Sequence, residues 1–224
     1  LITYPESRQY ILRQAVEDAI HTHAYQYCIE SLGMDEGEIF NMYHEVPSVA
    51  KKASWGLKYT RDLSDPTFNT GTLENDQKLL ANLIAFYCCL EGIFFYCGFT
   101  PILSMGRRNK MTGTSEQFQY ILRDESMHVN FGVDVINQIT LENPHLWDPE
   151  MRDQATPMIL DGTEPSIHYA RDTVHPGVLG MHPAQLAACP PFPANPRTPH
   201  TRRPPPAPLA GSWPPATPRA SEGW

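Results

Sequence analysis

The chain has few cysteines and no excess of basic residues. Its five cysteines form no CxxC pair and no regular spacing: Cys28, Cys88, Cys89, Cys97 and Cys189. We therefore expect free thiols of a reducing compartment rather than a disulfide framework. The 17 Lys and Arg residues against 25 Asp and Glu give a net charge of -8 at pH 7, which argues against nucleic acid as a partner.

Signals for export or membrane insertion are also missing. No basic segment followed by an apolar run opens the sequence, so no signal peptide is expected. The most apolar run, residues 79–99, contains Asn82 and Glu91 and precedes Pro101. These residues favour a buried bundle helix over a membrane span. We expect a cytoplasmic protein without a membrane partner.

Helical periodicity dominates the first three quarters of the chain. Apolar residues recur with helical spacing over residues 6–32, 35–57, 72–99 and 115–141, and Asp148-Pro149 is a typical helix start. Pro47 should interrupt the second of these helices. Pro101 should end the third, and Pro157 and Pro165 should break whatever follows residue 149. Long helices with short loops predict an all-α antiparallel bundle, which we assign to residues 1–181.

The end of the chain, residues 182–224, has a different composition. It holds 13 of the 22 prolines and lacks Lys, Ile and Tyr. Such a segment cannot bury enough apolar surface to fold, so we expect a disordered proline-rich tail. Its richness in Pro, Arg, Ala and Trp favours out-of-frame translation over a polyproline ligand built around Arg202 and Arg203.

An acid three residues before a histidine occurs four times. The four pairs are Asp18 and His21, Glu125 and His128, Glu142 and His145, and Asp172 and His175. The first two pairs lie within predicted helices, where positions i and i+3 project from one face. The last two adjoin prolines outside regular helix, so we set them aside.

A third predicted helix adds a carboxylate among aromatic residues. Glu91 is followed at i+4 and i+8 by Phe95 and Phe99, while Tyr25 lies one turn beyond His21. Taken singly, Tyr25 and the phenylalanines could be ordinary core residues, and Glu91 an interhelical hydrogen-bonding group. Taken together, the ionised carboxylates of the three faces would repel one another strongly without cations. The pattern predicts a di-metal carboxylate site in a helical bundle.

Residues 17–25, 90–99 and 121–128 resemble the small, radical-generating subunit of class I ribonucleotide reductase, and the similarity extends over about residues 7–181. The resemblance implies a ferritin-like bundle holding two iron ions, or an iron–manganese pair. In that family the metals react with dioxygen and oxidise a nearby tyrosine to a stable radical. It also implies a homodimer and, as partner, a large catalytic subunit that reduces ribonucleotides to deoxyribonucleotides.

The same resemblance implies a role for individual residues. Asp18 and His21 match ligands of the first metal, and Glu91, Glu125 and His128 match ligands of the second. Tyr25 matches the radical tyrosine. Asp124 matches an aspartate of the radical-transfer chain that hydrogen-bonds to the first metal's histidine. The apolar shield of the radical is matched by Phe95, Phe99 and Ile121.

Some positions depart from the family pattern. The family has glutamate where Asp18 stands, and the adjacent Glu17 should point about a quarter-turn away, as a weak substitute. The family's remaining aspartate ligand and a transfer tryptophan belong to an upstream segment, and its C-terminal docking peptide is replaced by the tail. We therefore expect weak or single-site iron binding and little tyrosyl radical. Another di-iron oxidase or oxygenase, and a non-catalytic helical fragment, are the alternatives.

Overall fold

The computed structural model describes residues 2–174, and within that range every regular element is helical. Its elements are α1 (Pro5–Ser31), α2 (Glu36–Glu45), α3 (Pro47–Thr60), η1 (Asp62–Ser64), α4 (Leu73–Leu83), η2 (Ile84–Phe95), α5 (Tyr96–Gly106), α6 (Thr112–Glu142), η3 (Pro144–Leu146) and α7 (Pro149–Val174). The all-α prediction is confirmed. The boundary expected at residue 181, the proline-rich tail, His175 and Cys189 lie outside the described residues.

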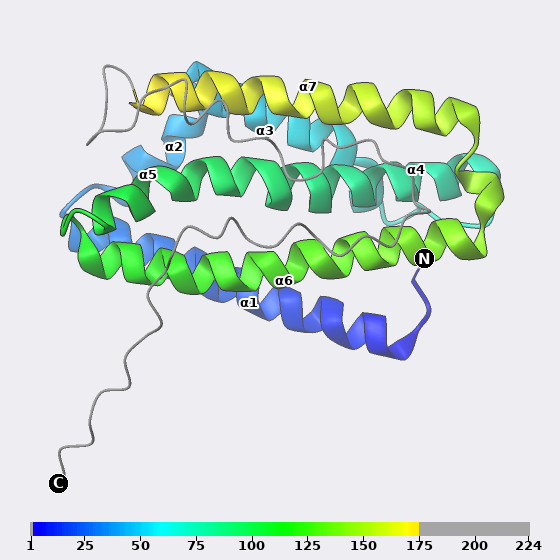
Figure 1. Cartoon of the computed structure of the whole chain (residues 1–224), viewed down its shortest axis with the longest axis horizontal. Helices are drawn as coiled ribbons and strands as arrows, with labels where there is room; N and C mark the ends of the chain where they lie inside the picture. Colours follow the sequence, from blue (N-terminus) through cyan, green and yellow to red (C-terminus); the bar gives the residue numbers. More distant parts are fainter. Residues whose placement is uncertain (1, 175–224) are drawn as a thin grey trace, which may run out of the picture.

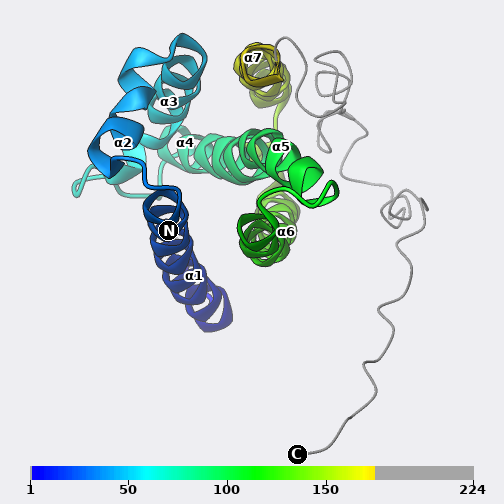
Figure 2. The same cartoon turned by 90° about the vertical axis from the view of Figure 1, so that its left-hand side faces the viewer.

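One long rod runs through the middle of the bundle. Helices α4 and α5 are joined by η2 into a continuous helical rod, and α3, α6 and α7 run alongside it (Figure 1). Viewed from the end, α3, α7, α6 and α1 surround this rod (Figure 2). Because the rod contacts helices on several sides, it can carry side chains into more than one interface.

The hydrophobic core lies between this rod, α3 and α7. Its buried members are Trp55, Leu80, Ile84, Ala85, Cys88, Cys89, Ile93, Phe94, Leu146, Met151, Ala155 and Met158. By length and composition, the rod over Leu73–Gly106 could cross a membrane, but 61% of its most apolar window is buried inside the bundle. A central core helix explains this apolarity, as expected from the sequence.

Three cysteines of the described residues, Cys28, Cys88 and Cys89, are free thiols. Cys28, Cys88 and Cys89 are buried, and Cys97 is partly buried. Burial raises the pKa of Cys88 to about 11 and the pKa of Cys89, which Cys88 also raises, to about 12. Both groups therefore remain neutral thiols in the core at physiological pH.

Local signals at the helix ends agree with the sequence. Gly33 has φ +68° just after α1, a conformation that glycine adopts without strain. Pro47 separates α2 from α3 and begins the second of them. The Asp148 carboxylate accepts a hydrogen bond of 2.7 Å from the backbone N–H of Met151, which caps α7.

Three prolines do not act as predicted. Pro101 lies inside α5, and Pro157 and Pro165 lie inside α7. The predicted breaks at these residues are therefore wrong. An internal proline costs a helix about 3 kcal/mol, but both helices pack along their length against neighbours, and Pro101 and Pro165 are themselves buried. Tertiary packing outweighs the local preference here.

The rod also departs from a regular α-helix at its centre. Residues Ile84–Phe95 form a π-helical segment of 12 residues, whereas the sequence predicted ordinary helix from 72 to 99. Near the end of this segment the ammonium group of Lys52 donates a hydrogen bond of 2.9 Å to the carbonyl oxygen of Phe94. The same ammonium lies 4.4 Å from the centre of the Tyr169 ring. This cation links α3 and α7 to the end of the π-helical segment.

Close packing of α6 on the rod gives a direct test of the fold. A Cβ added to Gly132 would overlap the ring of Tyr87, whereas a Cβ added to Gly113, on the same helix, would meet nothing within 4 Å. We expect Gly132→Ala to lower the free energy of unfolding by about 1–3 kcal/mol through overpacking. Gly113→Ala should cause no loss, because alanine favours helix. Chemical denaturation of both variants checks this, and equal stabilities would contradict the close approach of α6 to η2.

Candidate metal centre

Acidic and imidazole side chains from three elements meet inside the bundle. Asp18 comes from α1, Glu91 from η2, and Glu125 and His128 from α6, and one ligand atom of each lies within 4.8 Å of the others. Glu91, Glu125 and His128 are at most 1% exposed. The sequence prediction that these residues converge is thus matched by the geometry of the site.

The fifth predicted ligand, His21, borders the same cluster. Its Nδ1 atom lies 3.0 Å from Oε1 of Glu125 and 3.7 Å from Oδ1 of Asp18. The Nδ1 atom of His128 lies 3.4 Å from Oε2 of Glu125 and 3.9 Å from Oδ1 of Asp18. Asp18 and Glu125 therefore lie between two imidazoles whose ring centres are 6.1 Å apart.

Four buried atoms that face this cluster make no hydrogen bond within the described residues. They are Nδ1 of His21, Nδ1 of His128, Oε2 of Glu91 and Oε2 of Glu125. Buried polar atoms nearly always have partners, so four together need an explanation. Carboxylate oxygens and imidazole nitrogens are also the donors that iron and manganese ions accept. The residues present therefore fit a pair of such cations.

Without metal, the cluster must hold protons. Burial, with the nearby charges of Glu125 and Asp18, raises the pKa of Glu91 to about 9. Burial lowers the pKa of His21, but Asp18, Glu125 and Asp124 outweigh it and raise that pKa to about 10. For Glu125 the opposite balance holds: burial raises its pKa, and the two histidines lower it further than burial raises it. Protons thus provide positive charge where cations would otherwise do so.

Asp124 supports His21 from the outer side. Its Oδ2 atom lies 3.2 Å from Nε2 of His21, and its Oδ1 atom accepts a hydrogen bond of 3.1 Å from Arg123. Burial raises the pKa of Asp124, but His21 and Arg123 outweigh burial and keep the carboxyl ionised. The predicted Asp124–His21 contact is present, and it leaves the Nδ1 atom of His21 facing the cluster.

Tyr25 lies beside the acidic cluster in apolar surroundings. Its ring meets that of Phe118 edge-on at 5.5 Å, and Phe118 in turn meets Phe99 at 5.6 Å. Phe99 and Ile121 are each 3% exposed. Burial, followed by the charges of Glu125 and Asp18, raises the pKa of Tyr25. The phenol therefore stays protonated at neutral pH.

Phe95 is less buried than its spacing predicted. Its side chain is 37% exposed, although its ring still lies 6.1 Å from that of Phe99. The expectation that Phe95 shares a buried face with Glu91 assumed α-helical periodicity. The prediction that Phe95 is buried beside Glu91 is therefore wrong, because the neighbouring helices cover only part of its ring.

Several residues around the cluster were missed in the sequence. Gln14 donates a hydrogen bond of 2.6 Å to Oε1 of Glu91 and accepts one of 3.1 Å from the Tyr87 hydroxyl. Its position one turn before Asp18 on α1 was a usable signal. Phe118, seven residues before Glu125, was another. Tyr87 gave no comparable signal, because an apolar helix with an aromatic residue is most often plain core.

Glu17, expected about a quarter-turn from Asp18 as a weak substitute ligand, contacts the outer nitrogen of His128. It is 6% exposed, and its Oε2 atom lies 2.9 Å from Nε2 of His128. The Asp18 side chain, by comparison, is 41% exposed. Because α1 faces both η2 and α6, two adjacent residues of α1 can reach the site from different sides.

The proton-holding cluster predicts how stability depends on pH. In the metal-free fold, Glu91 keeps its proton to about pH 9 and His21 to about pH 10, against ordinary values of 4.5 and 6.5. The folded chain binds protons that the unfolded chain has released, so stability should fall between about pH 5 and 10. The slope should reach about 1.4 kcal/mol per pH unit for each proton.

Denaturation of metal-free protein at several pH values measures this slope. Glu91→Gln, whose amide stays neutral at every pH, should flatten it. His168→Gln, which changes a partly exposed histidine of α7, should leave it unchanged. A stability that rises from pH 6 to 9 would contradict the raised pKa values.

The chain is similar to known small subunits of ribonucleotide reductase. It is 49% identical over 180 residues to a ribonucleoside-diphosphate reductase subunit beta of Chlamydia pneumoniae, covering 80% of this chain and 52% of that protein. It is 26% identical over 184 residues to a small chain of the yeast Saccharomyces cerevisiae, covering 81% and 41%. The chain thus spans about half the length of the curated relatives it matches.

A solved structure has the same fold. The ribonucleotide reductase R2 subunit from Clostridium botulinum superposes with a TM-score of 0.73 at 25% identity, covering 83% of this chain and 57% of that one. The family model described as "Ribonucleotide reductase, small chain" matches residues 1–195. Together with the geometry of the site, this match shows that the chain belongs to the ribonucleotide reductase small-chain family.

Proposed function

We propose that this chain carries the di-metal site and the oxidisable tyrosine of a ribonucleotide reductase small subunit. The four buried donor atoms around Asp18 and Glu125 that make no hydrogen bond are the observation that supports the proposal most strongly. Asp18, His21, Glu91, Glu125 and His128 would hold the metals. A pair of iron ions, or iron with manganese, would supply with dioxygen the oxidising power that removes one electron from Tyr25.

The surroundings of Tyr25 suit such an oxidation. Because its pKa is raised, the neutral phenol must release a proton together with the electron. After burial, the charges of Glu125 and Asp18 raise the pKa of Tyr25 most. These two carboxylates are therefore the candidates to take part in the movement of that proton. Phe99, Phe118 and Ile121 exclude water on the other side, which would protect an oxidised phenol from reductants.

The pair formed by His21 and Asp124 supports transfer out of the site. The imidazole connects the cluster to a carboxylate that is 14% exposed and paired with Arg123. In the proposed function, this carboxylate lies on the route by which the oxidising equivalent leaves Tyr25. The receiving partner would be a large catalytic subunit that reduces ribonucleoside diphosphates, with the small subunit acting as a cytoplasmic homodimer.

Metal titration tests the site. We expect Glu125→Ala to weaken Fe²⁺ or Co²⁺ binding at least tenfold, because this carboxylate lies between both imidazoles. Glu116→Ala removes an exposed acid of the same helix and should leave binding unchanged. The measurement is calorimetric titration with metal analysis of the loaded protein. Equal binding by both variants would refute the proposed site.

Electron paramagnetic resonance tests the tyrosine. After addition of Fe²⁺ in air, any tyrosyl signal should vanish in Tyr25→Phe, while the amount of bound metal stays the same. The phenylalanine keeps the contact with Phe118 and removes only the hydroxyl. A radical signal that persists at full size in this variant would assign the oxidation to another residue, and oxidation of an added substrate without Tyr25 would favour a different di-iron oxidase.

A further inference from the structure

We propose that Glu17 is a positioning residue for His128, acting as the counterpart of Asp124 at His21. This inference rests on the proposed di-metal site and adds a residue to it. Glu17 would not bind metal itself. It would hold the His128 ring so that the Nδ1 atom faces the cluster.

The contacts of Glu17 use both of its oxygens. Oε2 lies 2.9 Å from Nε2 of His128. Oε1 accepts a hydrogen bond of 2.8 Å from Nε of Arg13 and forms an ion pair with Nη2 of the same guanidinium at 2.6 Å. Both oxygens therefore have a partner on the side away from the metal ligands' inward-facing atoms. The Glu17 carboxylate faces Nε2 of His128, whereas the Nδ1 atom of the same ring is the one that joins the cluster of donor atoms.

The arrangement repeats the one at His21. There, Nε2 of the imidazole faces Asp124, and Asp124 is held by Arg123. Both histidines therefore direct Nε2 to a carboxylate paired with arginine, and both leave a buried Nδ1 atom without a hydrogen bond. Two instances of the same order of groups, on different helices, point to one function for both carboxylates.

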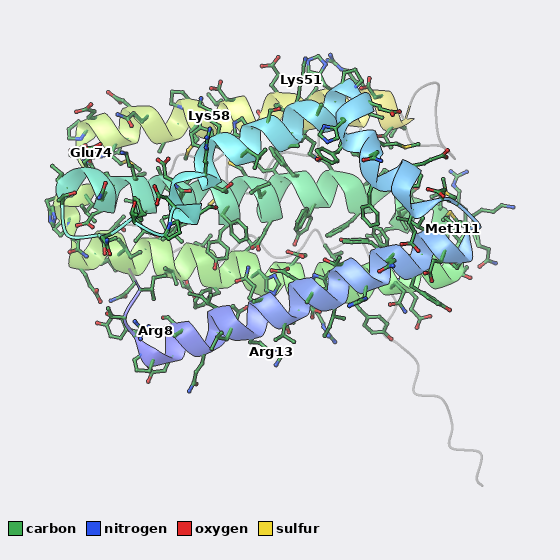
Figure 3. All side chains as sticks on the ribbon, turned by 180° about the vertical axis from the view of Figure 1, so that it is seen from behind. Arg8, Arg13, Lys51, Lys58, Glu74 and Met111 are labelled. Atoms are coloured by element: carbon green, nitrogen blue, oxygen red, sulfur yellow. The ribbon has the colours of Figure 1, made fainter. Side chains whose placement is uncertain are left out.

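The contact between Glu17 and His128 is buried, so the charge of the carboxylate has to be compensated. Glu17 is 6% exposed and His128 is fully buried, while the Arg13 side chain is 68% exposed on α1 (Figure 3). A buried carboxylate is stabilised only when its charge is compensated, and here an arginine reaches it from the surface side. The charge of Glu17 can therefore remain next to His128 in the folded chain.

The chemical effect follows from the two nitrogens of the ring. A carboxylate that accepts from Nε2–H fixes the proton on that nitrogen and leaves the lone pair of Nδ1 free for a metal. It also makes the imidazole a stronger donor. Loss of such a partner typically weakens metal binding 10- to 100-fold.

The test compares three variants loaded with Zn²⁺, which is diamagnetic and allows proton NMR of the ring N–H groups. Glu17→Leu removes the acceptor, Glu17→Gln keeps an oxygen acceptor of the same shape, and Asp124→Leu is the matched change at His21. Zinc affinity is measured by competition with a chelator. Circular dichroism melts verify that each variant is folded.

We expect the unsubstituted chain to show two slowly exchanging imidazole N–H signals. Glu17→Leu should lose the His128 signal alone and bind zinc 10- to 100-fold more weakly, whereas Asp124→Leu should lose the His21 signal alone. Glu17→Gln should keep the His128 signal and most of the affinity. Rescue by glutamine is the result that a merely structural effect of leucine would not give.

Two results would overturn the inference while leaving the proposed function intact. One is a Glu17→Leu variant with both N–H signals and unchanged zinc affinity. The other is a Glu17→Gln variant that loses as much metal as Glu17→Leu, which would make the carboxylate a ligand. Failure of the proposed function looks different, because then the unsubstituted chain binds no zinc, and the inference falls with it.

Discussion

Repulsion among closely packed carboxylates is the constraint on which this structure depends. Asp18, Glu91 and Glu125 come from three separate elements and approach within a few ångströms in an apolar bundle. Ionised carboxylates at such distances repel strongly when two of them, Glu91 and Glu125, are shielded from water, and positive charge between them makes the packing stable. His21 and His128 supply part of it. The raised pKa of Glu91 shows that, without cations, a proton must supply more.

Three elements of the bundle supply the side chains of the site. The rod formed by α4, η2 and α5 brings Glu91 to the cluster and packs the core with its other sides. Helix α6 supplies Glu125 and His128, and α1 adds Asp18, His21 and the outer carboxylate Glu17. Three of the ligands have a polar partner on their outer side, namely Gln14 at Glu91, Asp124 at His21 and Glu17 at His128. Hydrogen bonds thus hold the ligands from their outer side, while the four buried donor atoms that face the cluster make none.

The sequence was sufficient for the parts of the site that repeat with helical spacing. The acid and histidine pairs at 18 and 21 and at 125 and 128 share a face in any α-helix, so their convergence could be predicted. Glu17 could not, because a one-helix view cannot tell that α1 borders two other elements. The exposure of Phe95 and the prolines inside α5 and α7 were also missed, since tertiary packing overrides local preference at these places.

The π-helical segment makes the centre of this fold sensitive to the number of residues rather than only to their identity. Removal of one residue between 84 and 95, with the helical twist otherwise unchanged, would rotate everything after it by about a quarter-turn. Glu91 lies within this segment and Phe99 just beyond it, so such a deletion would turn one of them away from its partners. A substitution in this segment changes one side chain, whereas a change of length would displace the metal ligands and the aromatic residues around Tyr25 together.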